Sequence, residues 1–136
     1  MSVGSWDPKL QQSDARAAIS ADVLLRFIDI SQQAQLDTIA DVLDAEQQQL
    51  HARLMTLPRK AWEDAVVTLS DADVYHLMRF FTVAEMQLPG WEANDKSPVI
   101  WLNKILKARG KPLGKGQIQW IKQHTRNRFL PYGSVL

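Results

Sequence analysis

Apolar residues recur at the spacing of an α-helix along most of the chain, and this periodicity constrains the fold more than any other feature. Leu77, Phe81 and Leu88, for example, are four and seven residues apart, so a helix would place them on one face. Runs of residues that favour β-strands are almost absent. The pattern predicts an all-α protein, folded as a single compact bundle of five or six helices.

Capping residues, prolines and glycines indicate where these helices begin and end. Ser20 is a suitable N-cap, Pro58 stops a preceding helix, and Gly110 is a favourable helix terminator. Ser70, with Asp73 three residues later, resembles a capping box. The predicted helices cover residues 20–30, 34–57, 59–69, 71–87, 98–109 and 116–127, after an irregular N-terminus (residues 1–19) and before an apolar C-terminal tail that starts at Phe129.

Charge is divided unevenly along the chain, although the formal net charge is only +1. Residues 1–95 carry 15 acidic and 7 basic side chains, whereas residues 96–136 carry 9 basic side chains and no acidic one. The division falls at the one long loop of the predicted fold. The single helical domain over residues 1–136 therefore comprises an acidic helical region (20–88), the loop (89–97) and a basic helical region (98–136).

Three explanations of this division stay open. The acidic and basic regions face each other or simply coexist as solvated surfaces; the basic region binds an acidic protein or the acidic surface of a second copy; or it binds nucleic acid. We expect a protein partner or self-association, through a C-terminal face that comprises Lys104, Lys107, Lys111, Lys115, Trp120, Lys122 and Arg126.

Nucleic-acid binding, or a role in transcription regulation, is the alternative, using the predicted helices 98–109 and 116–127 as a helix-turn-helix. Lys122, Gln123 and Arg126 are residue types that contact phosphates and base edges. The connection between the helices is longer than that motif requires, and the sequence pI of about 8.0 lies below the range typical of such domains. The nucleic-acid hypothesis is therefore the weaker of the two.

Four leucines at a spacing of seven suggest a coiled-coil seam within the predicted helix 34–57. Leu36, Leu43 and Leu50 form this row, with Leu57 at its end. The neighbouring positions include Glu46 and Gln47, which would place long polar side chains in the seam. The row therefore favours a face buried in the bundle, and a homodimer seam through Leu36, Leu43 and Leu50 is the alternative.

Aromatic side chains give two further candidates for partner binding. Trp120 lies beside the basic row of its predicted helix, and Trp91 lies in the long loop. Either can pack against its own domain or anchor a partner, because tryptophan is common at binding hot spots. The tail after Phe129 is too apolar to remain in water without cost, so we expect it to fold back over the bundle, with exchange between subunits as the alternative.

Motifs of enzymes, cofactors and membrane proteins were not found. There is no cysteine, no His-Glu-x-x-His and no Gly-x-Ser-x-Gly, and the segment from Gly110 to Gly116 has the wrong spacing for a phosphate-binding loop. The longest apolar runs, about four residues, are far shorter than the ~20 needed to cross a bilayer. We therefore expect a small, cytoplasmic, non-enzymatic protein without cofactor or metal that acts by binding another macromolecule.

Overall fold

A computed structural model describes residues 19–134, and every regular element within that range is a helix. The all-α prediction is therefore confirmed, whereas the N-terminal residues 1–18, expected to be irregular, lie outside the described range. The helices are α2 (Ala21–Gln32), α3 (Ile39–Val42), α4 (Ala45–His51), α5 (Arg59–Val66), α6 (Asp71–Gln87), α7 (Pro98–Ala108) and α8 (Lys115–Gln123), with 3-10 turns η2 (Leu36–Thr38), η3 (Ala52–Thr56) and η4 (Asn94–Lys96).

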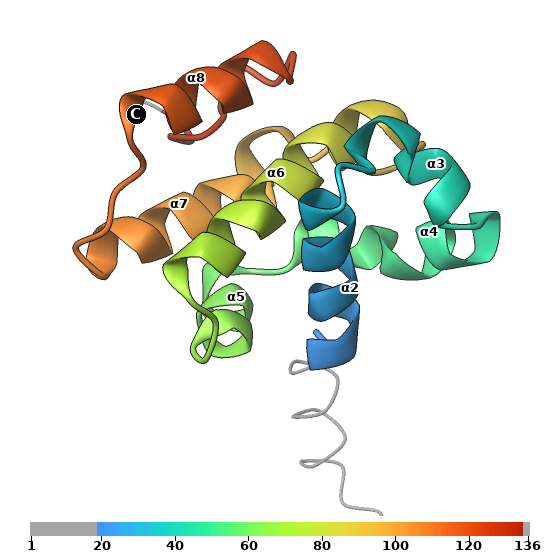
Figure 1. The fold of residues 1–136 in the computed structure, drawn as a ribbon, viewed down its shortest axis with the longest axis horizontal. Coiled ribbons are helices and arrows are strands. Elements are labelled where there is room, and N and C mark those ends of the chain that lie inside the picture. The colour runs from blue at the N-terminus through green and yellow to red at the C-terminus, as the bar shows by residue number, and fades with distance from the viewer. Residues whose placement is uncertain (1–18, 135–136) are drawn as a thin grey trace, which may run out of the picture.

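Helix α6 is the centre of the fold, with α2 packed on one side and α7 on the other (Figure 1). It starts where the sequence predicts, because the Ser70 hydroxyl accepts a hydrogen bond from the amide of Asp73 at 3.1 Å. Its C-terminal half is buried almost all round, from Phe80 to Glu85. A helix covered on every side has no solvent face, so its apolar residues extend beyond a single stripe.

The core around α6 is rich in aromatic rings. Phe80 stacks on Phe27 of α2 with ring centres 4.1 Å apart, and Phe81 meets Trp62 of α5 edge to face at 5.3 Å. Trp91, from the loop after α6, closes the cluster at 6.4 Å from Phe81. These rings join three helices and a loop in one buried group, where aromatic pairs add about 0.5–1.5 kcal/mol beyond their burial.

The prediction of one long helix over residues 34–57 is wrong. The chain is extended at Leu43, and Asp44 begins a new helix with a capping box: its carboxylate accepts from the Gln47 amide at 2.8 Å, and the Gln47 side chain accepts from the Asp44 amide at 3.2 Å. Seven α-helices result within residues 19–134, so the expected count of five or six is not confirmed.

Helix α7 follows its predicted bounds closely. Ser97 caps it, Pro98 occupies its first position, and Gly110 leaves it with a φ of +75° that a side chain would make costly. The side of α7 that carries Leu102 and Leu106 is buried against α5 and α6. In spite of its lysines, α7 is therefore an integral helix of the core.

Helix α8 lies apart from the other helices, above α6 and α7 (Figure 1). It ends at Gln123, not near Asn127 as predicted, and only Ile121 of its residues is fully buried. After α8 the chain reverses and returns toward the start of that helix (Figure 1). Leu130 is 2% exposed, and Gly133 lies so close to Ile100 of α7 that an added Cβ would come within 3.0 Å of its side chain.

Candidate functional site

The basic region presents lysines from both of its helices on the surface. Lys104 and Lys107 lie one turn apart on α7, Lys111 lies in the linker that follows it, and Lys115 and Lys122 lie two turns apart on α8. Lys104 is partly covered, whereas the other four are exposed. We call these five lysines, together with the tail residue Tyr132, the basic face.

Tyr132 joins the two halves of the basic face. The ammonium nitrogen of Lys107 lies 5.4 Å from the centre of its ring, and that of Lys122 lies 5.0 Å from the same point. The ring is 45% exposed, so an aromatic surface flanked by two cations remains open to solvent. Such cation–π contacts are worth about 0.5–1 kcal/mol at exposed sites, so they contribute only a little to the position of the ring.

The lysines of this face have no acidic partner within the described part of the chain. No carboxylate oxygen of residues 19–134 lies within 4.0 Å of their ammonium nitrogens. A mutual covering of the acidic and basic regions therefore does not take place at these five side chains.

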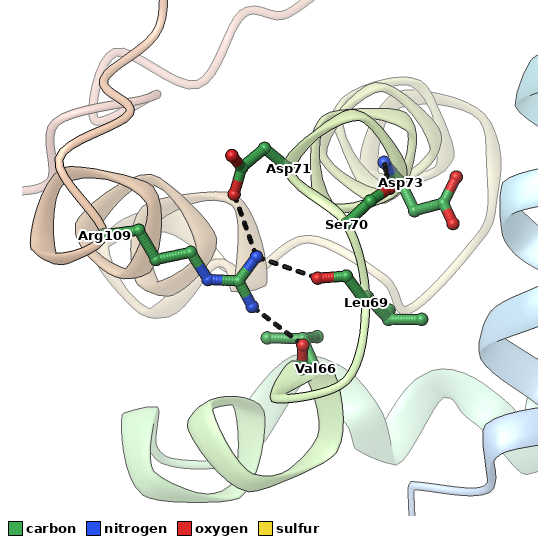
Figure 2. Close-up of polar contacts among 6 residues, drawn as sticks. All are labelled: Val66, Leu69, Ser70, Asp71, Asp73 and Arg109. Atoms are coloured by element: carbon green, nitrogen blue, oxygen red, sulfur yellow. Dashed lines mark hydrogen bonds and ion pairs between the residues drawn. The ribbon is translucent and has the colours of Figure 1, made fainter.

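Arg109 is the basic residue that does reach into the acidic region. Its guanidinium donates to the carbonyls of Val66 and Leu69, both at 2.9 Å, and to the Asp71 carboxylate at 3.0 Å (Figure 2). The group thereby satisfies carbonyls at the end of α5 and pairs with the first residue of α6. Arg109 thus has a structural role: it connects the end of α7 to the turn between α5 and α6.

Trp120 packs against its own domain. The guanidinium carbon of Arg79, from α6, lies 4.6 Å from the centre of its ring, and the His124 ring stacks on it at 4.0 Å. Both contacts are made by residues of the same chain, and Trp120 is half-buried. Its ring therefore fixes α8 to α6 and offers little surface to a partner.

Trp91 does not contribute to a binding surface in this structure, contrary to the expectation that it is a partner anchor. It is 0% exposed, and its indole nitrogen donates to the Gln48 carbonyl at 2.9 Å. The break at Asp44 explains this contact, because it turns α4 so that Gln48 meets the loop after α6. The alternative of packing within its own domain describes this residue correctly.

Arg126 lies away from the lysine stripe of α8. The helix ends three residues before it, so the spacing from Lys115 to Arg126 does not correspond to one helical face. Arg126 is exposed and lines a shallow pocket of about 270 Å3, together with Glu85, Glu92 and Asn127. The structure therefore separates it from the other members of the predicted face.

The three leucines proposed as a dimer seam do not share one surface. Leu36 and Leu43 are buried in the core, whereas Leu50 is 58% exposed on α4. A seam requires a continuous helix, but the helical conformation is interrupted at Leu43 and Asp44, between α3 and α4. The physical basis of that hypothesis is therefore wrong, and self-association stays a prediction that needs a different surface.

Glu85 is a buried ionisable residue that the sequence reasoning did not single out. It is 5% exposed, and its carboxylate accepts hydrogen bonds from the Ser97 hydroxyl, from Asn127 at 3.3 Å and from the Ala93 amide at 3.4 Å. Burial raises the pKa of Glu85 to about 7, against the opposing effect of these hydrogen bonds. Its position among the apolar residues Phe81 and Leu88 was the signal that could have identified it.

A serine, a histidine and an aspartate also lie close together between α2 and α6. The Ser31 hydroxyl is hydrogen-bonded to Nδ1 of His76 at 2.8 Å, and Asp73 precedes His76 by one turn. Ser31 is buried at the packed helix contact, and burial lowers the pKa of His76. The bond between Ser31 and His76 therefore holds α2 against α6.

Neither a metal site nor a membrane span is found in the described range. Among residues 19–134, no three or more histidine, aspartate or glutamate side chains gather closely enough to hold a metal ion. Within the same limits, no helix combines the length and the apolar composition that crossing a bilayer requires.

Comparison of the chain with protein-family models, with curated proteins and with solved structures gives no match. The function therefore has to be inferred from the geometry of the described residues.

Proposed function

We propose that this protein acts by binding an acidic segment of another protein through its basic face. One observation carries the proposal: lysines from two different helices converge on an exposed tyrosine ring, and no acidic side chain of the described chain neutralises them. Aromatic and cationic side chains together are the composition typical of binding hot spots. The protein is accordingly proposed to have no catalytic function.

An acidic protein is favoured over nucleic acid as the partner for two reasons. The rest of the sequence carries an excess of eight acidic charges, which would repel the phosphates of a long duplex. The C-terminal α8 is also short, and its start is joined to α7 by a linker from Arg109 to Gly114, unlike the tight turn of a helix-turn-helix.

The test is fluorescence anisotropy with labelled poly-glutamate as the acidic probe. Reversal of the two lysines beside Tyr132, in the double variant Lys107→Glu and Lys122→Glu, should weaken binding by about tenfold or more, because both cations become like charges of the probe. Lys60→Glu on α5 is the matched control, with an exposed lysine, the same change of charge per site and a position outside the basic face. It should bind like the wild type.

Two results would overturn the proposal. One is a loss of binding free energy in Lys60→Glu that is half the loss in the double variant, which would mean that the probe responds to net charge only. The other is tighter binding of a DNA duplex than of poly-glutamate, with a steep loss of affinity as salt increases, which would favour the nucleic-acid alternative.

A further inference from the structure

Asn127 makes several polar contacts at the base of the tail that carries Tyr132, in addition to the apolar contacts of Leu130 and Gly133. Its side-chain amide donates to the Glu85 carboxylate at 3.3 Å and to the Asn94 carbonyl at 2.9 Å. Its side-chain oxygen accepts from the Phe129 amide at 3.0 Å, and its carbonyl accepts from the Leu130 amide at 3.2 Å. Asn127 therefore both anchors the segment after α8 and shapes the reversal that brings Tyr132 back between the lysines.

Glu85, one of the groups that hold Asn127, is a buried carboxyl without a basic partner in the described range. Glu85 is almost completely buried, and among residues 19–134 no basic nitrogen lies within 4.0 Å of its carboxylate. A buried carboxylate without a cation is costly when it is charged, and hydrogen bonds offset this only in part. Glu85 also holds the Ala93 amide and the Ser97 hydroxyl, so one side chain joins α6, the loop, the start of α7 and the tail.

We infer that Glu85 and Asn127 form a pH-sensitive clasp, which positions the Tyr132 tail in the basic face and loosens when the Glu85 carboxyl loses its proton. The regulatory part rests on the proposed function, because the tail completes the surface that would bind the partner. The clasp itself does not, because it concerns the attachment of the tail in the free protein.

The direction follows from proton linkage. With the tail closed, burial raises the pKa of Glu85 to about 7, although the hydrogen bond from Asn127 acts against this. With the tail lifted, the carboxyl loses that bond but gains water, and because burial is the larger effect its pKa falls toward the ordinary value of 4.5. Closing therefore takes up a proton between these two values, and the closed state is favoured at low pH. Between pH 6 and 8, the population of the open state should increase by up to about tenfold, and above pH 7 the effect levels off.

Other charged groups face the clasp and have to be controlled. Glu92 lines the same pocket and raises the pKa of Glu85 further, and Arg126 lines it from the tail side. His124 lies three residues before Asn127, at the start of the segment that leads into the tail. Glu92→Gln and His124→Gln are therefore the matched controls for Glu85→Gln.

Hydrogen exchange of backbone amides tests the clasp without any partner. After correction for the intrinsic exchange rate, protection of the Leu130 and Gly133 amides should fall by up to about tenfold between pH 6 and 8. Protection of α6 amides, such as that of Phe81, should not show this fall. Glu85→Gln, which resembles the protonated acid, should keep the tail protected at both pH values. Glu92→Gln and His124→Gln should retain the pH step.

A second variant keeps the clasp falsifiable if Glu85→Gln does not fold. Asn127→Ala should reduce tail protection at both pH values and shrink the pH step, because Glu85 then loses its cover. Tail protection that is independent of pH in the wild type, or a step of equal size in Glu85→Gln, would overturn the clasp. Unchanged tail protection in Asn127→Ala would also overturn it.

Binding of poly-glutamate at pH 6 and 8 then separates the two proposals. If tail protection responds to pH but the protein does not bind poly-glutamate, the proposed function is wrong and the clasp stands. If binding depends on Lys107 and Lys122 but tail protection is independent of pH, the clasp is wrong and the proposed function stands. If both stand, affinity should be lower at pH 8 in the wild type and His124→Gln, and equal at both pH values in Glu85→Gln.

Discussion

Helices α7 and α8 have similar charge, and the structure uses them differently. Each carries lysines and no acidic residue, and the two follow one another in sequence. Yet α7 buries most of its length between α5 and α6, whereas α8 buries only Ile121 completely and leans on Arg79 through Trp120. Charge along the chain thus does not indicate which helix is structural, because that depends on the apolar residues between the lysines.

The largest expected difference concerns the apolar contacts of the two helices. Leu102→Ala in α7 should lower the free energy of unfolding by about 3–4 kcal/mol, because it leaves a cavity in the centre of the fold. Ile121→Ala in α8 should cost about 1–2 kcal/mol, because a weakly held helix can detach and limit the loss. Urea denaturation measures both, and equal losses would mean that α8 belongs to the central core.

The second prediction concerns the polar attachment of α7. Arg109→Met should cost about 2–3 kcal/mol in urea denaturation, since it leaves the carbonyls of Val66 and Leu69 and the carboxylate of Asp71 without their shared donor. Lys111→Met, an exposed position two residues later, should change stability by less than about 0.5 kcal/mol. Similar losses for the two would contradict the fastening role of Arg109.

The third prediction concerns the buried carboxyl to which the segment after α8 is attached. The pKa of Glu85 is raised in the folded protein to about 7, so the folded state binds more protons than the unfolded state between about pH 4.5 and 7. This contribution to stability is therefore present at low pH and is lost as pH rises through 7. Relative to Glu85→Gln, the wild type should lose about 1–2 kcal/mol between pH 6 and 8 in urea denaturation, and parallel pH profiles of the two proteins would contradict it.

The smallest effect on stability is expected at the surface where the two helices meet the tail. Tyr132→Ala should cost less than about 1 kcal/mol, because the ring is half-exposed and its contacts with Lys107 and Lys122 are worth little in water. It should nevertheless weaken poly-glutamate binding severalfold in the anisotropy assay. Val67→Ala, which truncates an apolar side chain that is 72% exposed directly after α5, should change neither quantity, and equal effects would contradict a specific role of Tyr132.

Local sequence signals located most of the helices. Ser20, Ser70 and Ser97 each cap the helix that was predicted to follow them, and Gly110 ends α7. The same kind of signal was overlooked at Asp44, whose capping box with Gln47 lay within an apparently continuous leucine row. Capping depends on residues three or four apart, so it can be deduced from the chain alone.

The candidate site was predictable only in part. The lysines of the basic face were identified as a group, but Arg109 was given no structural role, and Tyr132 and Glu85 were not included among the candidates. Trp91 was a separate candidate anchor and Arg126 was assigned to the face, although the structure buries the first and places the second in one pocket with Glu85. Each of these outcomes depends on contacts between residues more than 20 positions apart, which periodicity does not report.

The sequence by itself determined that this chain is helical, where most of its helices start and stop, and that its positive charge collects after residue 95. These properties are local or additive, so each can be computed from neighbouring residues. The tertiary structure alone decided which helix is enclosed and which lies at the surface, which cations are paired, and that the tail returns to place Tyr132 between two lysines. Burial and desolvation are properties of the packed molecule, because they depend on which distant segments exclude water from a given side chain.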